Sequence, residues 1–227
     1  MRTLLLFDID GTLMWGGKAA KDAFTEALER IYGRTGPVKG HDFSGKTDPQ
    51  IVRELLRIAG LADDVIDDGM HRFWDTYVAG LRERIVDHRP WLLPGVQDLL
   101  DRLAGATDVA LGLVTGNIAR GAELKLDSVG LGGRFAVGGF GSDHELRNRL
   151  PAVALDRARA HWEVDFAPEA TWVIGDTPRD VECGRANGTR TLAVATGSWS
   201  REDLNRTGAD EILDDFADVE RVTEILL

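Results

Sequence analysis

The sequence has little that would tie it to an oxidising compartment or to a membrane. Cys183 is its single cysteine, so the chain cannot form an internal disulfide, which fits a reducing cytoplasm. Its surroundings favour an ordinary core residue over a nucleophile. The apolar run at residues 3–7 is too short for a signal peptide, and no later run approaches the ~20 residues of a membrane span. We therefore expect a cytoplasmic protein without a membrane partner.

Positive charge is also scarce. The formal net charge is −11 and the isoelectric point is about 4.9. This balance repels the backbone of nucleic acids, so we do not expect nucleic acid to be a partner. The five histidines show no metal-ligand spacing, which argues against zinc. An acidic protein that binds an anion needs a metal ion or a local basic group at the site.

Four apolar runs indicate strands that are buried on both faces, as in a parallel sheet covered by helices. Helical patterns separate them along the chain, and this alternation predicts a doubly wound α/β fold, Rossmann-like in class. In such sheets ligands bind beyond the carboxyl ends of the strands. The four runs are residues 3–7, 109–114, 171–174 and 191–194, and the helical patterns are 121–129, 151–162 and 180–186.

A long helical region without strand patterns separates the first two runs. Apolar stripes predict one helix at Lys18–Tyr32 and another through Phe73–Leu81. Asp48 is expected to cap a further helix whose first position is Pro49. The sequence thus predicts a helical insertion at residues 16–89 in a catalytic core formed by residues 1–15 and 90–227.

Polar residues follow the first apolar run directly, in the sequence Asp8-Ile9-Asp10-Gly11-Thr12. Asp8 and Asp10 are two positions apart, so both side chains can point to the same side. One carboxylate can act as a nucleophile that forms an acyl-phosphate, and the other can exchange protons with the leaving alcohol and with water. Gly11 permits a sharp turn whose N–H groups can face an anion.

Two further runs end in polar residues of the same kind. Thr115, Gly116 and Asn117 offer a hydroxyl and backbone N–H groups that can bind a phosphate oxygen. Asp176 and Asp180, at the end of the third run, can complete an oxygen-rich site for Mg²⁺, although N-capping alone would also explain them.

Together these segments make the chain similar to the haloacid dehalogenase superfamily, and in particular to its phosphatases with a helical cap, the phosphoglycolate phosphatase and β-phosphoglucomutase groups. The resemblance covers the whole chain. Residues 8–12 resemble the first motif of the family, residues 114–117 the second and residues 175–180 the fourth.

The resemblance implies a role for each matching residue. Asp8 would be the nucleophile and a metal ligand, and Asp10 the acid/base that also offers its main-chain carbonyl to Mg²⁺. Thr115 would hold the transferring phosphoryl group. Asp176 would bind the metal, with Asp180 supporting it. The substrate would be a small phosphorylated metabolite, and the protein a monomer or homodimer.

The third motif departs from the family pattern, which has a lysine before a proline. Here the sequence before Pro151 contains Arg147 and Arg149, and Lys125 is the last lysine of the chain. An arginine can carry the same charge and bind phosphate with two N–H groups. We favour Arg147 over Arg149 because its position is closer to that of the family's lysine.

The sequence leaves other functions open. A phosphomutase would use the same chemistry with a different phosphoryl acceptor. Gly40–Thr47 matches the P-loop of nucleotide-binding proteins, although no apolar strand precedes it. A non-enzymatic phospho-aspartate receiver would also use Asp8, but it would not need the helical insertion. In the phosphatase, Lys46 would reach over the site to bind substrate, and Trp15 would line the pocket.

Overall fold

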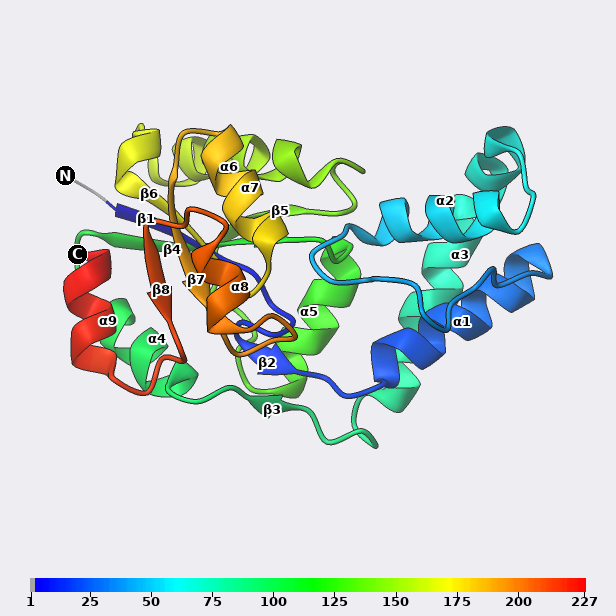
Figure 1. Ribbon diagram of the computed structural model, residues 1–227, viewed down its shortest axis with the longest axis horizontal. Helices are drawn as coiled ribbons and strands as arrows, with labels where there is room; N and C mark the ends of the chain where they lie inside the picture. Colours follow the sequence, from blue (N-terminus) through cyan, green and yellow to red (C-terminus); the bar gives the residue numbers. More distant parts are fainter. Residues whose placement is uncertain (1–2) are drawn as a thin grey trace.

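Six strands form a parallel sheet in the order β5-β4-β1-β6-β7-β8 (Figure 1). The computed structural model describes residues 3–227. The strands are β1 (Thr3–Phe7), β4 (Val109–Thr115), β5 (Val137–Phe140), β6 (Thr171–Gly175), β7 (Arg190–Val194) and β8 (Glu211–Leu213). The four apolar runs are β1, β4, β6 and β7, so the predicted doubly wound α/β fold is confirmed.

Helices cover both faces of the sheet, which explains why β1 is apolar without alternation. Leu5 and Phe7 pack in the cluster that contains α4 (Val96–Ala104) and α9 (Val219–Leu226). Leu4 and Leu6 point to the other face, towards α6 (Leu150–Trp162) and α7 (Pro178–Ala186). Cys183 lies fully buried in this second cluster, as expected of a core residue.

Three helices, α1 (Ala19–Tyr32), α2 (Asp48–Ile58) and α3 (Asp63–Arg84), lie to one side of the sheet (Figure 1). They share a hydrophobic cluster of their own, which Ile118 joins from the sheet side. The helix predicted through Phe73–Leu81 begins ten residues earlier, at Asp63, because its first turns carry few apolar residues.

The prediction that Asp48 caps α2 is wrong. Thr47 is the cap, and its hydroxyl accepts a hydrogen bond from the Gln50 N–H at 3.3 Å. Asp48 is the first residue of the helix, and its carboxylate accepts a hydrogen bond from the N–H of Ile118 at 2.8 Å. A tertiary contact thus claims the carboxylate that the sequence pattern assigned to the helix end.

Two short strands that the sequence pattern did not predict join the helical region to the sheet. Met14–Trp15 (β2) pairs antiparallel with Trp91–Leu92 (β3), and these strands lie where the chain leaves the sheet and returns to it. The two crossings therefore lie side by side, next to the end of β1.

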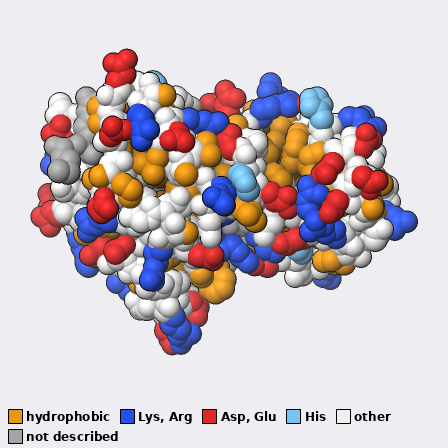
Figure 2. Space-filling view, turned by 90° about the horizontal axis from the view of Figure 1, so that it is seen from above, with side chains coloured by type: hydrophobic (Ala, Val, Ile, Leu, Met, Phe, Trp, Pro, Cys, Tyr) orange, Lys and Arg blue, Asp and Glu red, His pale blue; other side chains and the backbone are white. Residues whose placement is uncertain are grey.

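The remaining helices complete the coverage of the sheet. They are α5 (Ala119–Ser128), α8 (Arg201–Asn205) and the 3₁₀ turns Arg147–Arg149 and Pro168–Ala170. Among residues 3–227, no helix has the length and apolar composition needed to cross a membrane. Acidic and basic side chains are interspersed over the face shown in Figure 2.

Candidate active site

The carboxyl ends of three neighbouring strands bring the predicted motifs together. β1 lies between β4 and β6, with Phe7 opposite Leu113 on one side and Ile174 on the other. Asp8 follows β1, and its N–H donates to the carbonyl of Ile174 at 2.8 Å. Thr115 ends β4 and Asp176 follows β6, so their side chains meet at the same edge of the sheet.

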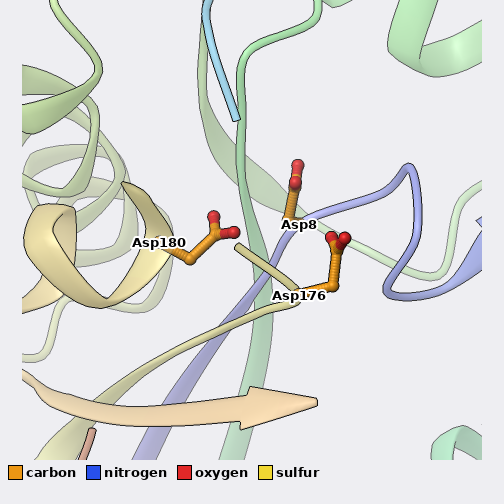
Figure 3. Close-up of side chains that lie close together, drawn as sticks. All are labelled: Asp8, Asp176 and Asp180. Carbon is orange, nitrogen blue, oxygen red and sulfur yellow. The ribbon is translucent and has the colours of Figure 1, made fainter. Parts of the chain in front are cut away.

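Asp8, Asp176 and Asp180 form a buried carboxylate cluster (Figure 3). One oxygen of each lies within 4.8 Å of the others, and all three are at most 5% exposed. Burial raises the pKa of Asp8 to about 6. Burial also raises the pKa of Asp176 well above its ordinary value, and the charges of Asp180 and Asp8 add to this effect. Crowded oxygen donors whose charges repel one another suit a hard divalent cation such as Mg²⁺.

Arg147 is a buried cation beside this cluster. It precedes α6, is 5% exposed, and places Nη2 3.2 Å from Oδ2 of Asp8. The same nitrogen donates a hydrogen bond to Asp180. Arg149, two residues later, is exposed. Of the two candidates for the third motif, only Arg147 lies within ion-pair distance of Asp8.

Asp10 lies in a separate hydrogen-bonded group. Its Oδ2 accepts from Nδ2 of Asn117 at 2.8 Å and from Nζ of Lys125 at 2.6 Å. The Asn117 amide also donates to the Thr115 hydroxyl at 2.8 Å. The carboxylate of Asp10 is not a member of the cluster formed by Asp8, Asp176 and Asp180, so a metal contact of Asp10 would have to use its main-chain carbonyl.

Gly11 and Gly116 allow close approaches of the chain at the site. Gly11 has φ +81°, and a Cβ there would lie 2.5 Å from the Asp176 carboxylate. A Cβ on Gly116 would lie 2.0 Å from the carbonyl oxygen of Lys46. The Gly116 carbonyl also accepts from the Asp48 N–H at 2.7 Å. Gly116 is therefore one point where the segment before α2 contacts the sheet side.

Lys46 lines the cavity but is already paired. Its Nζ lies 2.5 Å from Oε2 of Glu54 on α2. The P-loop alternative requires a buried strand before Gly40, and residues 33–47 contain no strand. The P-loop prediction therefore fails on its structural context.

A cavity of about 440 Å³ lies between the carboxylate cluster and the helical region. Asp8, Asp10, Thr115 and Arg147 line its sheet side. Trp15 also lines it, as predicted, at the crossing between the two parts. Its opposite wall combines cationic and aromatic side chains, namely Lys21, Phe24, His41, Phe43, Lys46 and Tyr77.

Residues 5–185 match the family model for haloacid dehalogenase-like hydrolases. The chain belongs to this hydrolase family. The prediction drawn from the first, second and fourth motifs is thereby confirmed.

Curated relatives agree with this haloacid dehalogenase-like assignment over nearly the full length. The chain is 32% identical to a phosphoglycolate phosphatase of Synechococcus elongatus, covering 98% of both chains. It is 31% identical to an N-acetylmuramic acid 6-phosphate phosphatase of Pseudomonas aeruginosa, covering 92% of this chain and 89% of the relative. The prediction of a hydrolase that acts on phosphate esters is confirmed.

Solved structures share the fold of this haloacid dehalogenase-like chain. CbbY from Rhodobacter sphaeroides in complex with phosphate superposes with a TM-score of 0.72 at 20% identity, covering 96% of both chains. A putative β-phosphoglucomutase from Bacteroides vulgatus gives 0.72 at 19% identity, covering 99% of this chain and 88% of the other. At these identities the likeness concerns the fold alone. With relatives named phosphatases, the phosphomutase alternative is not favoured.

Sequence reasoning missed Lys125 and the contact of Asp48. Lys125 is buried on α5, where a lysine would ordinarily be solvated. One pattern could have revealed it: Lys125 lies on the same helical stripe as Ile118, Ala122 and Leu126, all of them buried. A lysine on an apolar stripe next to a predicted phosphate-binding turn indicates a buried charge with a partner.

Proposed function

We propose that this chain is a magnesium-dependent phosphatase that hydrolyses a small phosphate monoester in the cytoplasm through an aspartyl-phosphate on Asp8. One observation carries the proposal. Asp8 stands at the end of β1, 3.2 Å from the buried Arg147, and faces a cavity that Asp10 lines as well. A nucleophile, a cation and a second carboxylate thus share one enclosed space.

In the first step, a carboxylate oxygen of Asp8 bonds to phosphorus while the bond from phosphorus to the ester oxygen breaks. The ester oxygen keeps the electron pair and takes a proton from Asp10, so the alcohol leaves neutral. Arg147 lies next to Asp8 and can bind an oxygen of the transferring group. Thr115, also in the cavity wall, can donate its hydroxyl proton to another.

In the second step, water attacks phosphorus and Asp10 takes a proton from it. The bond from phosphorus to Asp8 breaks, which frees the Asp8 carboxylate and inorganic phosphate. Asp8, Asp176 and Asp180, with the main-chain carbonyl of Asp10, would hold Mg²⁺, which supplies positive charge that offsets the charge of the phosphoryl group.

Residues 16–89 are proposed to act as a cap over this site. Their helices have their own hydrophobic cluster, and their side chains form the cavity wall opposite Asp8. A cap that excludes water protects the aspartyl-phosphate from premature loss and selects the substrate. We place Lys46 among the residues that contact the substrate's distal part, because it lines this wall.

The substrate class follows from the relatives only in its common part. Their names include phosphoglycolate and N-acetylmuramic acid 6-phosphate, which are both phosphate monoesters of small organic molecules. A cavity of about 440 Å³ has room for a ligand of that size.

Turnover of p-nitrophenyl phosphate tests the proposal. We expect hydrolysis with Mg²⁺, none with EDTA, and a loss of at least ~10³-fold in Asp8→Asn, because the amide is a poor nucleophile. Asp108→Asn is the matched control, since Asp108 is exposed at the opposite end of the sheet, before β4. Normal activity in Asp8→Asn would rule out the aspartyl-phosphate route.

A further inference from the structure

Lys125 is a buried cation that the proposed chemistry leaves without a role. Its side chain is 5% exposed, and its Nζ lies 2.6 Å from Oδ2 of Asp10 and 2.6 Å from Oδ1 of Asn117. Burying an ammonium group costs several kcal/mol unless it is paired and hydrogen-bonded. Lys125 therefore has a specific place in the structure, and its ionic partner is Asp10.

Lys125 and Asn117 together hold one oxygen of Asp10. Oδ2 accepts from Lys125 Nζ and from Asn117 Nδ2, at 2.6 Å and 2.8 Å. Among residues 3–227, no hydrogen bond to Oδ1 of Asp10 is formed. Two fixed donors on one oxygen restrict rotation of the carboxylate and leave the other oxygen free to form a further hydrogen bond, in a residue that lines the cavity.

The two buried cations of the site serve different carboxylates. Arg147 contacts Asp8 and Asp180, whereas the ion pair of Lys125 is with Asp10. A lysine ammonium is a donor with no acceptor capacity, so charged Lys125 cannot take the proton of the attacking water. Its positive charge can attract the negative charge that Asp10 gains when it gives its proton to the leaving oxygen.

We propose that Lys125 is a positioning residue that acts through Asp10. Together with Asn117 it fixes the carboxyl group so that its second oxygen exchanges protons with the leaving alcohol and then with water. This inference rests on the proposed phosphatase function. In the family, the third motif supplies one lysine. Here two cations would share its role: Arg147 beside the proposed nucleophile Asp8, and Lys125 beside the proposed acid/base Asp10.

The dependence of the rate on the leaving group tests this role. p-Nitrophenol leaves readily without a proton, whereas phenol needs one. In Lys125→Met we expect kcat/KM to fall by about 100-fold for phenyl phosphate and by less than about 10-fold for p-nitrophenyl phosphate. Lys125→Arg, which keeps the charge, should recover part of the loss. An equal loss for both substrates, or none for either, would overturn the inference.

A double-mutant cycle separates action through Asp10 from an independent effect. If Lys125 acts through Asp10, then Asp10→Asn combined with Lys125→Met should lose no more activity on phenyl phosphate than Asp10→Asn alone. Additive losses would contradict the proposal. If Lys125→Met does not fold, Lys125→Gln, which keeps a donor without the charge, takes its place in both experiments.

Asp8→Asn, measured on the same two substrates, keeps the two proposals distinguishable. If Asp8→Asn is inactive, the phosphatase function stands whatever the Lys125 variants show. If Asp8→Asn is active, the aspartyl-phosphate route fails before Lys125 is considered.

Discussion

Among single residues, Arg147 has the contacts on which the charge balance around Asp8 depends. It is buried, and its guanidinium reaches two carboxylates as well as the carbonyls of Gly45, at 3.2 Å, and Val114, at 3.4 Å. An arginine can do this because its planar group spreads several N–H donors over a wide fork. A lysine at the same position would offer its charge at one point and could not keep all of these contacts.

We therefore expect Arg147→Met to lower kcat/KM by about 10²-fold or more, as is found when one preorganised donor is removed from the transition state. Two carboxylates would also lose their buried partner, and the variant should be less stable by about 3–5 kcal/mol without metal. Steady-state kinetics and urea denaturation of the same preparations measure both effects.

Arg149→Met is the control for Arg147→Met, because Arg149 is the exposed arginine of the same turn. Its activity should match that of the wild type, and its stability should lie within about 0.5 kcal/mol. Equal losses of activity and stability in the two variants would show that these properties depend on the turn as a whole and not on the cation beside Asp8.

Some site residues could be predicted from neighbouring residues in the sequence, whereas others depend on contacts between distant parts of the chain. Asp8 and Asp10 could be found from the sequence because an apolar strand that stops at acidic residues is a local pattern. The helical stripe of Lys125 indicates that it is buried, but its partner could not be found from a local pattern, because Asp10 is 115 positions earlier in the chain and only the fold brings the two side chains together.

Among the elements, four of the six strands of the parallel sheet and most helices were predictable, because both faces of the sheet are buried and the helices carry clear apolar stripes. The short strands β5 and β8 were not predicted. β2 and β3 were not predicted either, because two-residue strands have no period. The start of α2 was misjudged at Asp48 for a different reason. Local rules give its carboxylate to the helix end, whereas the fold uses it to hold the N-terminus of α5.

The junction between α2 and α5 should make stability depend on pH. Asp48 is 9% exposed, and burial raises its pKa to about 6. Between its ordinary pKa of 3.8 and about 6, the folded state binds a proton more readily than the unfolded state. The contribution of Asp48 to stability therefore falls as pH rises through this window, by roughly 3 kcal/mol at most.

Comparison of the wild type with Asp48→Asn isolates this contribution. The amide does not titrate, and the other buried carboxylates cancel because both proteins contain them. Relative to Asp48→Asn, the wild type should be more stable at pH 5 than at pH 8, measured by urea denaturation without magnesium. A difference in stability that is the same at both pH values would refute the buried titration of Asp48.

At the scale of the whole molecule, the negative charge of the chain opposes the binding of an anionic substrate. A chain of net charge −11 is proposed to bind an anionic ester, and the sheet edge where it would bind holds a cluster of three buried carboxylates. Arg147 offsets part of this charge beside Asp8 and Asp180, and Lys125 offsets part of it beside Asp10. A divalent cation in the cluster would relieve the remaining repulsion and would therefore stabilise the fold as well as the reaction.

Magnesium should accordingly raise the melting temperature, and the rise should depend on pH. At a concentration about 100 times the dissociation constant, binding adds about 2.7 kcal/mol, or roughly 5–10 °C for a chain of this length. Protons compete for the same oxygens. Since the pKa of Asp8 is raised to about 6 and that of Asp176 is also raised, the affinity for magnesium should fall as pH falls below about 6. Thermal unfolding at pH 8 and pH 5.5, with and without magnesium, should show the larger shift of the melting temperature at pH 8.

The variant Asp176→Asn should lose this magnesium-dependent shift at both pH values, whereas the control Asp108→Asn should keep it. A shift that survives in Asp176→Asn would place the metal elsewhere.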